Sequence, residues 1–175
     1  MTNTPPKRAA QSISVRQELT SLLLKVAVVA AVVGLFFTFL YGVHRATGAD
    51  MGTTVKDGDL TAFCRVDKSY AVGDLVALSV EGQFQVRRVV AVGGDVVDIT
   101  SNGLVINGAL QDETNVAQPT RPYVDGAQFP LTVGQGEVFV LGDARENATD
   151  SRVYGPVAIR DTLGKVIGFV RMREL

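Results

Sequence analysis

The segment that decides the fold of this chain spans residues 142–155 and reads GDARENATDSRVYG. It follows directly on Glu137–Leu141, an apolar run of the composition that is typical of a β-strand. Its opening pair, Gly142-Asp143, favours a tight turn, and such a pair taken alone carries no functional information. We therefore expect an apolar strand that ends in a turn and continues into this polar segment.

Three more segments with Gly-Asp or Asp-Gly turns precede it. They read DMGTTVKDGD at residues 50–59, GDLVA at residues 73–77 and RRVVAVGGD at residues 87–95. Runs rich in β-branched or aromatic residues adjoin these turns and predict strands at residues 60–66, 75–80, 84–92, 96–99 and 166–172. Residues 104–108 end in Asn107-Gly108, a strong hairpin signal because both residues tolerate a positive φ.

These patterns predict a mainly β domain of short antiparallel strands over residues 44–175. A hairpin and loop insertion is expected at about residues 96–136, with residues 114–128 forming a surface loop because they are rich in Pro and polar residues. The even spacing of the strands favours a barrel-like or folded-sheet architecture.

One segment has the composition of a transmembrane helix. Residues 26–43 carry no charge, and with the three leucines before Lys25 the apolar stretch would be about 33 Å long as a helix, enough to cross a bilayer. We expect a cytoplasmic tail over residues 1–20 and a transmembrane signal anchor over residues 21–43. Four basic residues against one acidic residue in residues 1–43 place the N-terminus in the cytoplasm and residues 44–175 outside. The alternative is a cleaved signal with Thr47-Gly48-Ala49 at its end, but the apolar run is longer than such signals need.

The composition excludes several classes of function. Residues 44–175 carry 17 acidic and 13 basic residues, so they offer no basic surface for nucleic acid. The chain has one cysteine, Cys64, and one histidine, His44, which exclude a disulfide framework and argue against a metal site. We expect no cofactor, and we expect Cys64 to be a small buried residue.

The four segments, in this order after one membrane anchor, resemble the type I signal peptidases. The resemblance covers about residues 22–175, and residues 142–155 carry its most specific motif. It implies a mainly β fold at the outer face of the membrane and cleavage of signal peptides by a Ser/Lys dyad. In that dyad a serine immediately precedes Met51, and a lysine immediately precedes Arg88.

The chain departs from the family pattern at both of these positions. Asp50 stands in place of the serine and Arg87 in place of the lysine, and Ala148 replaces a further serine of the site. A guanidinium stays protonated in proteins even when it is buried, so it cannot serve as the general base. The resemblance therefore implies a signal peptidase fold without its dyad.

Four other side chains could substitute for the lost groups. Thr53 and Thr54 offer a hydroxyl, and Lys56 and Lys68 offer an amine. None of these completes a recognisable catalytic group, and the role of Ser151 in the family pattern is supportive.

The exchanged residues suggest a structural arrangement. Asp50 and Arg87 replace neighbours in the family fold, so we expect a bidentate ion pair between them that fills the former active site. The charged residues kept from the family pattern are expected to form a buried or half-buried structural network; together with the neighbouring serine they are Arg88, Asp143, Arg145, Asp150, Ser151 and Arg152.

Two hypotheses remain open at this stage. The first is a non-catalytic, membrane-anchored accessory protein for export or pilus assembly, similar to the signal-peptidase-like proteins of some Gram-positive bacteria in which the dyad is also replaced. Its partners would be the bilayer, signal peptides or pilin precursors, and a pilus sortase. The second is an active type I signal peptidase that cleaves secreted precursors.

Overall fold

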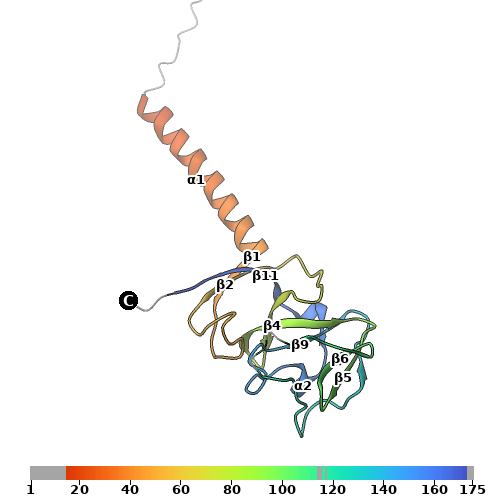
Figure 1. The fold of residues 1–175 in the computed structure, drawn as a ribbon. Helices are drawn as coiled ribbons and strands as arrows, with labels where there is room; N and C mark the ends of the chain where they lie inside the picture. The colour runs from red at the N-terminus through yellow and green to blue at the C-terminus, as the bar shows by residue number, and fades with distance from the viewer. Residues whose placement is uncertain (1–14, 114–115, 117, 173–175) are drawn as a thin grey trace, which may run out of the picture. The chain divides into compact units, whose positions relative to one another are not determined.

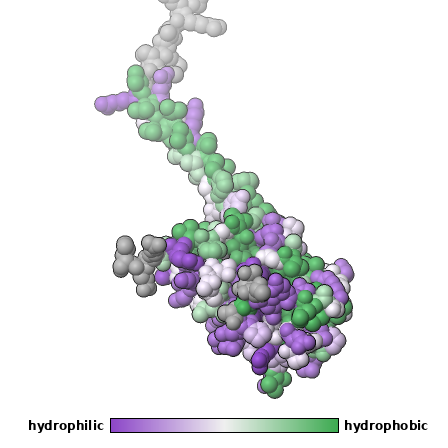
Figure 2. Space-filling view, in the orientation of Figure 1, coloured by the Kyte–Doolittle hydropathy of each residue, from purple (hydrophilic) through white to green (hydrophobic). Residues whose placement is uncertain are grey.

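The computed structural model describes residues 15–113, 116 and 118–172. The chain divides into two units, Met1–Thr38 and Phe39–Leu175. Helix α1 (Val15–Leu40) is 26 residues long, or about 39 Å, and none of its residues is buried. Its side chains are almost all apolar beyond the first two turns, as Figure 2 shows, so it is long and apolar enough to cross a membrane.

The bounds of this helix differ from the predicted ones at both ends. It begins at Val15, within the tail predicted over residues 1–20, of which residues 1–14 lie outside the described part of the chain. It ends at Leu40, because residues 41–43, predicted to be helical, are part of a strand that pairs with residues 62–64.

The larger of two antiparallel sheets has seven strands (Figure 1). In spatial order they are β1 (Tyr41–Arg45), β2 (Leu60–Cys64), β11 (Gly164–Val170), β3 (Leu75–Val80), β4 (Gln83–Val92), β9 (Glu137–Leu141) and β10 (Val157–Ala158). The first and last strands of the chain's β domain thus lie on either side of β2. The prediction of a mainly β domain of short antiparallel strands is confirmed.

The smaller sheet lies within the predicted insertion. Its strands are β7 (Ala109–Leu110), β6 (Gly103–Ile106), β5 (Val96–Thr100) and β8 (Leu131–Thr132), in that order. The predicted hairpin turn is present, with φ of 52° at Asn107 and 80° at Gly108. The two-residue strands β7, β8 and β10 were not predicted, because runs this short carry little periodicity.

Three clusters of buried apolar residues hold the β domain together. One lies around Phe139 and Val97, between the two sheets. A second surrounds Phe63 and Phe84 and includes Met51, and a third joins Val76 and Val140. Residues 142–155 leave the end of β9, so the start of the diagnostic segment is fixed by a strand whose last four residues are fully buried.

Candidate functional site

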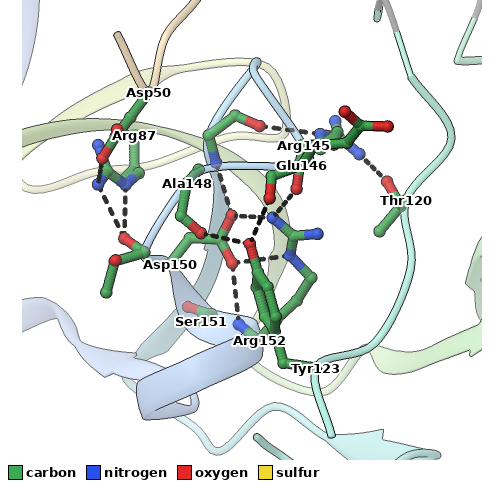
Figure 3. A network of polar contacts seen from close by, with 12 residues as sticks. Asp50, Arg87, Thr120, Tyr123, Arg145, Glu146, Ala148, Asp150, Ser151 and Arg152 are labelled. Carbon is green, nitrogen blue, oxygen red and sulfur yellow. Dashed lines mark hydrogen bonds and ion pairs between the residues drawn. The ribbon is translucent and has the colours of Figure 1, made fainter. Parts of the chain in front are cut away.

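The site begins at an ion pair between two residues that are far apart in the sequence. Asp50 follows β1, and Arg87 lies on β4; Arg87 Nη2 is 2.5 Å from Asp50 Oδ2 (Figure 3). The Arg87 side chain is 2% exposed and that of Asp50 is 30% exposed. The expected pair is therefore present, but through one contact instead of the bidentate arrangement expected from the sequence.

The remaining donors of Arg87 explain why the contact is single. Its Nε and Nη2 donate to the Thr149 carbonyl oxygen at 3.0 and 2.8 Å, and its Nη1 donates to the Val86 carbonyl oxygen at 2.7 Å. A buried guanidinium needs partners for its N–H groups, and backbone carbonyls supply most of them here. Arg87 thus ties β4 to the loop of residues 142–155 and to the segment after β1.

Asp150 and Arg152 form a second, fully buried pair. Arg152 Nε and Nη2 donate to the two carboxylate oxygens of Asp150 at 2.9 and 2.8 Å. Asp150 also accepts from the backbone N–H of Gly142 and caps the short helix α2 (Ser151–Tyr154) by accepting from the Arg152 backbone N–H. The Ser151 hydroxyl oxygen accepts a hydrogen bond from the backbone N–H of Val140 in β9.

Asp143 and Arg88 form a third pair. Arg88 Nε and Nη2 donate to Asp143 at 2.9 and 2.7 Å, and the Thr54 hydroxyl donates to the same carboxylate at 2.6 Å. Burial alone would raise the pKa of Asp143, but the bonds from Arg88 and Thr54 outweigh it and hold that pKa below its usual range. Asp143 is therefore a stable anion that binds the segment after β1 to β4.

Arg145 connects the site to the insertion. Its Nη1 contacts the Glu113 carboxylate and the Thr120 hydroxyl, and its Nε donates to the Gly142 carbonyl at 2.9 Å. Burial lowers the pKa of Arg145, and the Glu113 charge opposes that effect. Sequence reasoning missed Glu113 and Thr120, because no motif connects them with a residue more than 20 positions away.

Ala148 and Gly142 lie where residues 142–148 pack against the segment after β1. Ala148 is 1% exposed, and its carbonyl oxygen accepts from the Tyr123 hydroxyl at 3.0 Å. A methyl group added to Gly142 would lie 2.3 Å from Ala148 Cβ and 2.6 Å from the Asp50 carbonyl oxygen. The segment after β1 therefore packs against residues 142–148 with no space for a side chain at Gly142. Tyr123 also belongs to the site, because Arg152 Cζ lies 4.7 Å from the centroid of its ring, and the sequence did not reveal this residue.

Of the four residues that could substitute for the catalytic groups, three lie outside the charge network. Thr53 and Lys56 are exposed. The amine of Lys68 donates to the carbonyl oxygens of Arg160 and Thr162. Only Thr54 lies within the charge network, through its bond to Asp143.

Two cavities adjoin the network. A cavity of about 10 Å³ lies beside Asp50 and Arg87, with Ala46, Phe84 and Val86 among its walls. This is close to the smallest space that holds one water molecule. A larger cavity of about 380 Å³ lies beside Arg88 and Asp143. In the described residues no group of three His, Cys, Asp or Glu side chains has an arrangement that would hold a metal ion.

The comparisons with known proteins agree on one family. A family model described as "Signal peptidase, peptidase S26" matches residues 19–170. Signal peptidase IB of Staphylococcus aureus is 28% identical over 171 residues, which cover 86% of this chain and 88% of that protein. The probable thylakoidal processing peptidase 2, chloroplastic, of Arabidopsis thaliana is 35% identical over 82 residues, and the chain spans 21% of that protein's length.

A crystal structure of a signal peptidase I from Enterococcus faecalis is similar over 57% of this chain and 97% of that one, with 27% identity and a TM-score of 0.47. The family model covers most of the chain, from within the apolar helix to the end of β11. The chain belongs to the signal peptidase family, peptidase S26.

Proposed function

We propose that this protein is a membrane-anchored member of the signal peptidase family that binds extended peptides without cleaving them. The observation that carries the proposal is the buried Arg87, whose donors are bonded to Asp50 and to backbone carbonyls. In the family pattern these two positions hold the base and the nucleophile. A protonated guanidinium bonded to a carboxylate supplies neither.

The sheet offers a place for a peptide to bind. Among the described strands, β1 is the end strand of the larger sheet, and the first half of β4 pairs only with β3, since β9 pairs with β4 from Arg88 onward. Among the described residues no backbone hydrogen bond joins β1 to β4, although His44 of β1 contacts Phe84 of β4 through its ring. An extended peptide can add to such unpaired edges through its own backbone groups.

The proposal extends to location and partners. Basic residues precede the apolar helix, which supports an orientation with the N-terminus in the cytoplasm and the β domain outside. The peptides are then signal peptides or pilin precursors, and the protein acts as an accessory in export or pilus assembly, next to a pilus sortase. Cross-linking in membranes from a pilus-forming host tests this: recovery of a pilin precursor or sortase supports it, and recovery of neither contradicts the pilus role.

The second candidate is an active signal peptidase that uses Thr54. Its hydroxyl donates to the Asp143 carboxylate, as a nucleophile would donate to a base. The lowered pKa of Asp143 and its two bonds from Arg88 make this carboxylate a weak base, so we favour the non-catalytic function.

A cleavage assay separates the two functions. The full-length protein in lipid vesicles is incubated with a precursor carrying a signal peptide, beside an authentic signal peptidase. Three variants are tested in parallel: Asp50→Ser with Arg87→Lys, the same pair with Ala148→Ser, and Thr54→Val. Non-catalytic function predicts no cleavage by the native protein and a gain of cleavage when the dyad is restored. Specific cleavage by the native protein that Thr54→Val abolishes would establish the second candidate instead.

A further inference from the structure

The strand at the free edge of the sheet carries the chain's only histidine. His44 lies on β1 and is exposed, while its ring stacks on buried Phe84 with the ring centroids 4.2 Å apart and the planes at 14°. Phe84 is 8% exposed and also packs against Phe63 at 5.8 Å. His44 therefore covers one face of Phe84 at the place where β1 and β4 have no backbone pairing.

Phe84 also borders a small cavity. The cavity of about 10 Å³ has the buried side chains of Ala46, Met51, Val55, Phe84 and Val86 among its walls, together with Asp50 and Arg87. This volume is close to the smallest that holds one water molecule. A peptide side chain can enter only if one of the walls moves.

The backbone of β1 is held more firmly than its histidine. All five residues of β1 pair with β2, and a methyl group added at Gly42 would lie 2.2 Å from the Phe63 ring, so β1 lies directly on that ring. Within the described part of the chain, the His44 side chain has one polar contact, from its Nδ1 to the Arg45 carbonyl oxygen at 3.0 Å. It can turn into solvent without breaking the pairing of β1 with β2.

We propose that His44 is a cover that closes the peptide site in the free protein. It leaves Phe84 when an extended peptide with a small apolar side chain adds along β1 and β4. This inference rests on the proposed peptide-binding function and adds a step to it, since binding must displace the ring of His44. The ring and the peptide side chain compete for the same apolar surface of Phe84, so the free protein binds peptide more weakly than an uncovered one.

Peptide affinity measures the effect of the cover. A fluorescent signal-peptide probe is titrated with the full-length protein in detergent micelles, and the dissociation constants of the native chain, His44→Ala and Val66→Ala are compared by anisotropy. Val66 is the control, because it lies outside β1 and β4 and is 60% exposed. We expect His44→Ala to bind about two- to tenfold more tightly, the range of an aromatic pair, and Val66→Ala to bind as the native chain does.

The single histidine also gives a direct reading of the cover. Stacking on Phe84 shifts the ring proton resonances of His44 upfield in NMR spectra, and Phe84→Leu gives the unstacked reference. Saturating peptide should move the native resonances toward that reference. If His44→Ala binds peptide no more tightly than the native chain, or if the His44 resonances do not move while peptide binds, the proposed role of His44 as a cover is wrong and the peptide-binding function still stands. Failure of all three chains to bind overturns the peptide-binding function and the cover with it.

Discussion

Removal of the Asp50 carboxylate tests whether its ion pair with Arg87 stabilises the β domain. In the variant Asp50→Ala, Arg87 keeps its bonds to the carbonyl oxygens of Thr149 and Val86 but loses its counter-charge while it remains 2% exposed. Breaking a fully buried pair costs about 3–5 kcal/mol. Asp50 is 30% exposed, so water reaches the gap and weakens the penalty. We expect the free energy of unfolding to fall by about 1–3 kcal/mol, or the melting temperature by roughly 3–10 °C.

The measurement is urea denaturation of the full chain in detergent, followed by circular dichroism of the β domain. Asp161→Ala is the matched control, because it also removes a carboxylate from an arginine, Arg160, but at 3.7 Å and with both side chains largely exposed. The control should cost less than about 0.5 kcal/mol. A cycle with Arg87→Met gives the coupling of the pair, which should be about 1–2 kcal/mol. A loss from Asp50→Ala no larger than that of the control, or a coupling near zero, would refute the structural role of the pair.

Three further variants probe the rest of the network. Asp143→Asn should reduce the amount of stability that the domain loses in acid. Because the pKa of Asp143 is lowered in the folded state, its contribution to stability is present above about pH 4 and is lost as the pH falls through its folded pKa. Unfolding curves measured at pH 7 and pH 3 should therefore differ less in the variant than in the native chain. Gly142→Ala should destabilise the domain by about 1–3 kcal/mol or more through overpacking against Ala148, whereas Gly168→Ala, which meets no atom within 4 Å, should be tolerated; equal melting temperatures would contradict the packing argument. Asp150→Ala should cost about 3–5 kcal/mol because it strands a buried arginine, and a soluble, cooperatively melting variant with native stability would show that the pair is dispensable.

Most of the strands could be predicted from local patterns. β3 and β9 lie at the predicted residues, and β4 and β5 differ by one residue at an end. Their β-branched and aromatic runs are bounded by turn residues, which marks them as strands even where, as in β3 and β9, burial does not alternate along the run. β1 was assigned to the helix because its first three residues continue an apolar run, and only its pairing with β2 separates the two. Cys64, predicted to be buried, is half-buried in β2, because it lies at the end of that strand.

The pairing of charges was predictable only in part. The partnership of Asp50 with Arg87 was expected from the family resemblance, which makes the two positions neighbours, but their single contact follows from the carbonyl oxygens that surround Arg87. The partner of Arg145 was not predictable, because the chain has 18 acidic residues and nothing local marks Glu113. The tertiary structure makes Glu113 the partner, because it brings the insertion against residues 142–145.

The sequence by itself determined an apolar helix, a mainly β domain, a family and the presence of Asp50 and Arg87 where the family resemblance implies a Ser/Lys dyad, because each of these depends on local composition or on motifs read in order. Only the tertiary structure decided what contacts Asp50 and Arg87 make. It buries Arg87 among carbonyl oxygens, leaves about 10 Å³ beside Asp50 and lays His44 over Phe84. These outcomes depend on contacts between segments more than 30 residues apart, and their energies come from burial and close packing, which no local pattern records.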